Sequence, residues 1–281
     1  IIYKDSPYDI HPEKYEIDRL MEEAERLNIE MHLFMPEQFD LIVTQDDDKS
    51  ILLNEEYTSL PDFVLPRMGA RTTYYSLAVL RQLERLGVHI FNSPESIDIV
   101  KDKLYTHQIL AKSGIPVPKT MLIKYPIDVR LVEKHIGFPV VVKTISGSQG
   151  SGVFLCETKS HFEDLIQLIK ETRSHTNIIL QEFVKSSRGR DLRVITIGGR
   201  AIACMERIAT NGGFKANFST GGEVRNYPMN AEIEWLATES SRILNLDIAG
   251  IDLLFDGEHY KICEANSSPG FKGIEQCSGI N

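Results

Sequence analysis

The chain has 281 residues, 42% hydrophobic and 25% charged, and this ordinary composition and length predict two or three folded lobes. Its formal charge of −9 argues against general adhesion to nucleic acid or to an anionic membrane. No apolar run approaches the roughly 20 residues of a membrane helix, and four scattered cysteines without a Cys-x-x-Cys pair fit reduced thiols in the cytoplasm.

Strand and helix patterns alternate over the first third of the chain. The expected elements are a helix at 12–27, a strand at 29–34, a short apolar run at 62–65, a helix at 73–86 and a strand at 88–91. This alternation predicts an open parallel α/β sheet in an N-terminal lobe that covers residues 1–92.

A second lobe is expected over residues 93–184. Ser93 followed by Pro94 predicts the start of a helix, and Gly114 predicts its end. The following pattern predicts strands at 138–143 and 153–157 around a glycine-rich turn, a helix at 160–172 and a strand at 178–184. Together these elements predict a small α+β lobe.

A third lobe is expected over residues 185–281, with a C-terminus that is expected to be incomplete. Gly198 and Gly199 join two apolar runs and predict a hairpin. A glycine-bearing loop at 209–222, a helix at 231–244 and a hairpin of 250–256 with 258–266 follow. Sheets with helices to one side predict a second α+β lobe that faces the first.

Three oxygen-bearing side chains stand on the last predicted hairpin. If residues 257–259 form a three-residue loop, Asp252 lies opposite Glu264, and Asn266 follows on the same face. Oxygen ligands without cysteine or histidine suit Mg²⁺, with Mn²⁺ as a substitute. A solvent-facing polar stripe is the alternative, but apolar residues flank Asp252, where an unpaired carboxylate is costly.

A glycine-rich turn and several basic residues suggest a polyphosphate ligand. The turn from Gly147 to Gly152 can close its backbone N–H groups over phosphate oxygens, although the motif alone favours a flexible hairpin turn. Each basic residue alone predicts only a solvated surface. Their accumulation around the carboxylate hairpin of an acidic protein favours a phosphate role for Lys103, Lys143, Arg193, Arg207 and Lys215.

Several short motifs follow one another in a fixed order. They are Lys101-Asp102-Lys103, the 138–143 strand, the glycine turn, Gln181–Val184, Asp191–Arg193, Lys215–Asn217 and the 264–270 segment, with 66–69 and 78–84 in the first lobe. In this order they resemble the ATP-grasp superfamily, and within it the RimK-like α-L-glutamate ligases. The resemblance spans most of the chain and implies an ATP-grasp fold, in which an N-terminal α/β lobe precedes two α+β lobes that clamp ATP.

The resemblance implies roles for named residues. The phosphates would meet Lys103 and Lys143 under a lid that contains Gly147, Ser148, Gly150 and Gly152, while the adenosine would meet Gln181, Glu182, Phe183, Val184 and Asp191. Mg²⁺ would bind Asp252, Glu264 and Asn266, with Arg207, Lys215 and Asn217 at the transferred phosphate. Arg193 and Ala216 would also contact the nucleotide. Relatives often carry Arg-Ser-Asn at 215–217, and lysine lacks the bidentate fork of arginine.

The activity implied by the resemblance is ATP-dependent carboxylate–amine ligation. A substrate carboxylate would attack the γ-phosphate, and an amine would displace phosphate from the acyl phosphate, with Arg207 as the stabiliser of the oxyanion. The expected partners are glutamate and a carboxylate on a peptide, protein or small molecule, and a homo-oligomer is an open option. Arg67 and Arg71, which follow a predicted strand end, are candidates for binding a substrate carboxylate, the alternative being a surface ion pair.

Two other classes of protein would use the same residues. A phosphotransferase would pass the phosphate to a hydroxyl as its final product, so phosphate release that depends on an added amine would distinguish a ligase from it. A regulatory module would hold ATP without turnover. The set of Asp252, Glu264 and Asn266 argues against a module.

Overall fold

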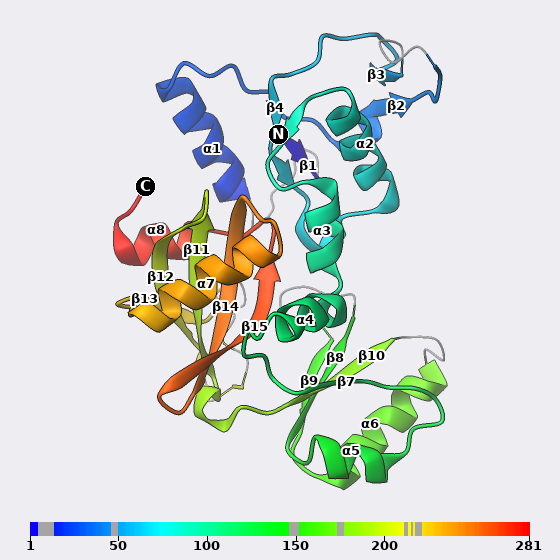
Figure 1. Ribbon diagram of the computed structural model, residues 1–281, viewed down its shortest axis with the longest axis vertical. Helices are drawn as coiled ribbons and strands as arrows, with labels where there is room; N and C mark the ends of the chain where they lie inside the picture. The colour runs from blue at the N-terminus through cyan, green and yellow to red at the C-terminus, as the bar shows by residue number, and fades with distance from the viewer. Residues whose placement is uncertain are drawn as a thin grey trace.

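The computed structural model describes residues 1–4, 14–45, 50–145, 152–172, 177–210, 213–214, 216 and 221–281. Figure 1 shows an N-terminal lobe at the top, a C-terminal lobe at the left and a central lobe at the lower right, with the helices α3 and α4 between them. Within the described ranges, no helix is long and apolar enough to cross a membrane.

The N-terminal lobe contains the expected parallel sheet. Residues 63–67 pair in parallel with β1 on one side and β6 on the other, and Phe34 forms a parallel bridge to Ile2. The elements are β1 (Ile2–Tyr3), β4 (Phe63–Val64), β5 (Pro66–Arg67), β6 (His89–Ile90), α1 (Lys14–Arg26), α2 (Tyr74–Arg85), η1 (Pro36–Gln38) and η3 (Gly69–Arg71). Their core includes Val79 and Leu80 of α2.

Two details of this lobe differ from the sequence-based expectation. The predicted strand at 29–34 is wrong, because only Phe34 pairs and Ile29 remains 38% exposed. An antiparallel ribbon of β2 (Phe39–Leu41) and β3 (Ile51–Leu53) was not predicted. An apolar run forms a strand only where a partner strand lies beside it, and the sequence of the run does not report the partner.

The helix predicted after Ser93 is two helices, α3 (Pro94–Lys101) and α4 (Lys103–Lys112). Asp102 has an extended backbone, and its Oδ1 accepts hydrogen bonds from the N–H groups of Leu104 at 2.9 Å and Tyr105 at 3.0 Å. It therefore caps the second helix. The motif Lys101-Asp102-Lys103 is a helix junction and not a continuous helix face, so Lys103 begins α4.

The central lobe is a four-stranded antiparallel sheet with two helices on it. The strand order is β7 (Thr120–Leu122), β10 (Ile178–Glu182), β8 (Val140–Thr144) and β9 (Val153–Cys156), and the helices are α5 (Val129–His135) and α6 (Lys159–Thr172). Phe162 of α6 packs with alternate strand residues such as Val140, Val142 and Leu180. Alternation with period two leaves the other face of β8 and β10 for Lys143 and Gln181.

The C-terminal lobe is a five-stranded antiparallel sheet. Its order is β13 (Glu223–Asn226), β12 (Arg200–Ile208), β11 (Arg190–Ile197), β14 (Ile248–Asp256) and β15 (His259–Asn266), preceded by η4 (Lys185–Ser187). The helix α7 (Ala231–Ile243) packs on one face, together with Val100 and Leu110 of α3 and α4. The expectation of helices to one side is wrong, because Ile274 of α8 (Lys272–Ser278) packs on the opposite face.

Asn92 joins the N-terminal lobe to the C-terminal lobe. Its side chain donates to the carbonyls of Ile248 and Ser267, both at 2.7 Å, and accepts from the N–H groups of Asp247 at 2.7 Å and Ile248 at 3.1 Å. The residue is 1% exposed and has a φ of 54°, a left-handed conformation that asparagine tolerates. Four hydrogen bonds of one buried amide fix the junction.

We expect Asn92→Ala to lower the free energy of unfolding by about 2–4 kcal/mol, because buried backbone groups lose their partners. The matched control is Asn54→Ala, since Asn54 also has a positive φ, of 51°, but is exposed. The control should lose less than about 1 kcal/mol. Urea denaturation measures both, and equal losses would show that the backbone conformation, and not the bonding, makes Asn92 important.

Candidate functional site

One face of the C-terminal sheet carries a row of charged side chains. The strand register places Asp191 opposite Arg207, Arg193 opposite Asp252, and Asp252 opposite Glu264. Residues opposite one another on paired strands share a face. Because Leu192 and Ile251 pack under α7, the charged row lies on the other face of the sheet, the one that α8 partly covers.

A β-bulge at Cys263 places Asp252 opposite Glu264. The turn has two residues, since Asp256 pairs with His259, and an even turn would place these two carboxylates on opposite faces. The register shifts between Leu253 and Asp252, where Cys263 is the extra residue. The predicted pairing is confirmed, whereas the predicted three-residue loop is wrong: the odd residue lies in the strand.

Asp252 is held by two arginines. Arg193 donates from Nε to Oδ1 at 2.7 Å and from Nη2 to Oδ2 at 2.8 Å, and Nη2 of Arg207 lies 2.9 Å from Oδ2. Arg207 also binds Asp191 through both carboxylate oxygens, at 2.7 and 2.8 Å. Two carboxylates thus face two guanidinium groups, and this pairing is what allows Asp252 and Arg207, each 5% exposed, to be buried.

The pKa values of the two carboxyl groups move in opposite directions. Burial tends to raise the pKa of Asp252, but Arg193 and Arg207 outweigh it and hold the pKa below the ordinary value. At Asp191 burial prevails over Arg207 and raises the pKa. The pKa of Arg207 is raised by Asp191 and Asp252 against the effect of burial, so its positive charge is permanent.

Glu264 and Asn266 extend the row to the edge strand β15. Oε1 of Glu264 lies 3.4 Å from Nζ of Lys103, the first residue of α4. Asn266 donates from Nδ2 to the carbonyl of Gly250 at 3.3 Å. The structure therefore brings Lys103 to Glu264, one of the predicted metal residues.

Lys143 crosses from the central lobe to the bulge. Its Nζ donates to Oε1 of Gln181 at 2.6 Å and lies 3.6 Å from Sγ of Cys263. His107 of α4 contacts the Cys263 carbonyl through Nε2 at 3.0 Å, and burial lowers the pKa of its imidazole. Because a carbonyl oxygen can only accept a hydrogen bond, Nε2 must carry the proton of the neutral imidazole. Sequence analysis did not single out Cys263 or His107, since each bond spans over a hundred residues.

The residues expected at adenine lie where β10 ends. Oε1 of Glu182 accepts from Nζ of Lys261 at 2.6 Å, which links the central lobe to β15. The guanidinium of Arg188 stands 5.8 Å from the Phe183 ring, and Val184 is buried at the start of η4. Adenine recognition by this segment stays a prediction.

Three residues of the predicted nucleotide lid, Gly147, Ser148 and Gly150, lie outside the described residues. Lys215 and Asn217 also lie outside them. Ala216 is described and buried. Gly152 has a φ of 74°, and a Cβ there would lie 2.5 Å from Oγ1 of Thr144. This position requires glycine on both counts, whatever the turn binds.

The two arginines predicted at the substrate lie in different surroundings. Arg67 is 5% exposed, donates from Nη2 to the Pro269 carbonyl at 2.8 Å and stands 5.9 Å from the Phe271 ring. It therefore joins the N-terminal lobe to the segment after Asn266, and its side chain is buried and does not lie on the surface. Arg71 is exposed and lines a cavity in the N-terminal lobe.

The oxygen donors of the charged row fit Mg²⁺. In the described part of the chain no group of three His, Cys, Asp or Glu residues is placed to hold a metal ion. Two carboxylates and an amide are nevertheless an ordinary set for Mg²⁺, which fills its remaining positions with water and phosphate oxygens. Asp252 would have to exchange at least one arginine contact to coordinate the ion.

Known protein families match most of the chain. The RimK-like ATP-grasp domain matches residues 100–281, and the RimK PreATP-grasp domain matches residues 10–97. A probable α-L-glutamate ligase of Legionella pneumophila (strain Corby) is 34% identical over 272 residues, which are 96% of this chain and 89% of that protein.

Solved structures show the same fold. The ATP-grasp ligase PsnB, complexed with a phosphomimetic variant of a minimal precursor, Mg and ADP, gives a TM-score of 0.76 at 18% identity over 100% of this chain and 94% of that chain. D-alanine–D-alanine ligase from Bacillus anthracis gives 0.67 at 18% identity over 97% and 88%. The chain therefore belongs to the family of RimK-like ATP-grasp ligases.

Proposed function

We propose that this ATP-dependent ligase joins glutamate to a carboxylate of a peptide, protein tail or small molecule, with Mg²⁺-ATP bound between the central and C-terminal lobes. The observation that carries the proposal is the contact of Lys143 with Cys263, the residue that precedes Glu264. This contact brings a buried lysine of the central lobe to the charged row of the C-terminal lobe. The similarity to a probable α-L-glutamate ligase supports the choice of glutamate.

The first step would be attack of the substrate carboxylate on the γ-phosphate, which yields an acyl phosphate and ADP. Lys103 and Lys143 would bind phosphate oxygens as charge passes to the leaving group. Mg²⁺, held by Asp252, Glu264 and Asn266, would neutralise phosphate charge. Lys103 is suited to this because it already lies beside Glu264.

In the second step the amine would attack the acyl carbon, lose a proton and expel inorganic phosphate. A cationic donor would stabilise the tetrahedral oxyanion, and the raised pKa of Arg207 keeps its guanidinium charged. Its bonds to Asp191 and Asp252 use Nε and Nη2, and the proposed role assigns Nη1 to the oxyanion. The two carboxylates fix the plane of the guanidinium.

The direct test is ADP formation across a panel of amino acids and carboxylate acceptors, with mass spectrometry of the products. An amide product that contains glutamate, with phosphate release that requires both substrates, would support the proposal. A phosphorylated hydroxyl product would identify a phosphotransferase instead. ATP binding without ADP formation under any condition would identify a regulatory module.

Lys143→Met should weaken binding of a non-hydrolysable Mg²⁺-ATP analogue by about 10- to 100-fold, because a charged hydrogen bond is lost. The control is Lys159→Met in the same lobe, whose lysine is exposed and paired with Glu133. Calorimetry measures both affinities. Unchanged affinity in the Lys143 variant would remove this lysine from the nucleotide site.

Glu264→Ala and Glu264→Gln should each remove most turnover and leave the free energy of unfolding within about 1 kcal/mol of the parent, since the Glu264 side chain is 33% exposed. Asp252→Ala should remove turnover and also cost about 3 kcal/mol or more, because Arg193 and Arg207 lose their buried counter-ion. Steady-state kinetics and denaturation separate the two effects. An active Glu264→Ala enzyme would exclude Glu264 from the metal site.

A further inference from the structure

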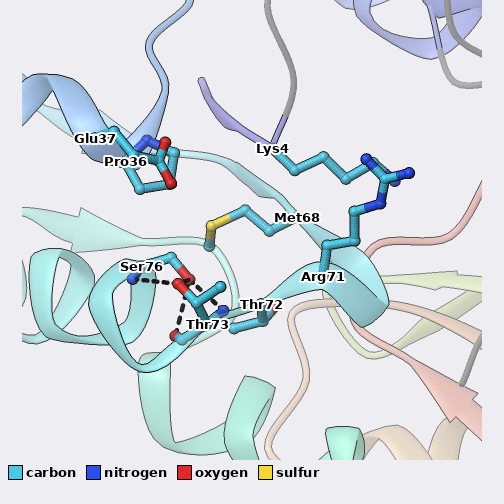
Figure 2. A pocket seen from close by; sticks show the side chains of 8 residues that line it. All are labelled: Lys4, Pro36, Glu37, Met68, Arg71, Thr72, Thr73 and Ser76. Carbon is cyan, nitrogen blue, oxygen red and sulfur yellow. Dashed lines mark hydrogen bonds between the residues drawn. The ribbon is translucent and has the colours of Figure 1, made fainter. Parts of the chain in front are cut away.

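A cavity of about 470 Å³ lies in the N-terminal lobe, outside the charged row described above. Its volume falls within the roughly 300–1,000 Å³ of small-molecule sites. The lining residues are Lys4, Pro36, Glu37, Met68, Arg71, Thr72, Thr73 and Ser76. Figure 2 shows Lys4 and Arg71 at one end of the cavity and Pro36 with Glu37 at another, with the Met68 side chain between them.

The cavity stands at the carboxyl edge of the parallel sheet. Lys4 follows β1, Met68 follows β5, and Pro36 comes two residues after Phe34, which bridges Ile2 in parallel. Because these three segments run in the same direction, their carboxyl ends meet at one edge. Open α/β sheets bind ligands outside this edge.

The wall on the α2 side is fixed in place. Thr73 Oγ1 accepts from the Ser76 N–H at 3.1 Å, Ser76 Oγ donates to the Thr73 carbonyl at 2.9 Å, and Thr72 Oγ1 donates to the Gly69 carbonyl at 2.7 Å. These bonds occupy the hydroxyl groups, so the wall provides shape. The charged side chains of the lining are those of Lys4, Glu37 and Arg71.

The charges of the lining suit an amino acid. Lys4 and Arg71 outnumber Glu37, so the local charge is positive in a chain whose formal charge is −9. Met68, which is buried, supplies an apolar surface between the two ends. A carboxylate at the basic end, an aliphatic stem over Met68 and an ammonium at Glu37 would match all three features.

The segment that bears Arg71 is linked to the end of β15, the strand that carries Glu264 and Asn266. Arg67 in β5 donates to the carbonyl of Pro269, three residues after Asn266, and stands over Phe271. A ligand in the cavity would thus lie against a segment that is fixed to the end of β15. This connection relates the cavity to the ligation site.

We propose that this cavity binds the carboxylate end of an acidic substrate, with Lys4 and Arg71 on the carboxylate and Glu37 on an ammonium group. The inference deepens the proposed function, on which it rests for the identity of the ligand as a substrate. Free glutamate and the C-terminal residue of an α-linked glutamate peptide share the carboxylate and its stem. They differ in whether the ammonium belongs to the same residue.

The test is calorimetric titration of the full chain with L-glutamate, with N-acetylglutamate and with α-linked triglutamate, with and without Mg²⁺ and a non-hydrolysable ATP analogue. Arg71→Met and Lys4→Met should each weaken binding about tenfold or more. The control Arg85→Met removes the same charge from the exposed far end of α2 and should stay within about twofold. Glu37→Gln should weaken L-glutamate and leave N-acetylglutamate and the peptide unchanged.

Binding that neither Arg71→Met nor Lys4→Met weakens, or no binding of any of the three ligands, would overturn the proposal. So would preferential binding of inorganic phosphate to the same residues. Circular dichroism checks that each variant is folded. Because Arg71 and Lys4 are substituted separately, the test still holds if one of the two variants does not fold. Glutamate binding that needs Arg71, in a chain without ligase products, would sink the proposed function alone, whereas full ligase activity with an unchanged KM for glutamate in both variants would sink the cavity alone.

Discussion

The buried carboxylate of Asp252, held between Arg193 and Arg207, is the interaction on which the candidate site depends. The three residues lie on β14, β11 and β12, so their bonds span three adjacent strands. A slip of one residue in any of these strands would carry its charged side chain to the face where Leu192 and Ile251 pack under α7. The sheet register is therefore specified twice, by apolar packing on one face and by charge pairing on the other.

The N-terminal and C-terminal lobes are fastened to each other at the end of β15. Asn92 binds the carbonyl of Ser267, Arg67 binds that of Pro269, and Glu16 accepts from the N–H groups of Phe271 and Lys272. All of these contacts fall within six residues of Asn266. The N-terminal lobe thus fixes the position of the chain directly after β15, in addition to forming the cavity.

Sequence patterns identified the sheets and helices that have local signals, and they failed where a distant contact decides. Ser93 was predicted to cap a helix from the local sequence alone, and it caps α3. The bulge at Cys263 has no such signal, because its carbonyl meets His107 and its thiol meets Lys143, 156 and 120 residues away. The pairing of Asp252 with Glu264 was therefore predicted correctly from a loop that does not exist.

Charge patterns were similarly informative about location and silent about partners. Of the residues expected around a polyphosphate, Arg193, Arg207, Asp252 and Glu264 do share one face of the C-terminal sheet. Asp191, expected at ribose, binds Arg207 through both oxygens. The geometry leaves a ribose role for Asp191 untested. The sequence shows which charged residues are present. It does not show which of them pair, because pairing depends on the strand register, and local composition does not encode the register.

The pairing of Asp252 with arginine has a consequence for how ligands would enter. A metal ion at Asp252 competes with Arg193 for the same two oxygens, so binding of the ion alone would leave a guanidinium without its counter-ion in a largely buried place. Phosphate alone would compete with Asp252 for Arg193 and leave the carboxylate unpaired. The two together supply each group with a new partner, the ion for Asp252 and phosphate oxygen for Arg193. We infer that the exchange favours the metal–nucleotide complex over either component, because only the complex leaves no buried charge unmatched.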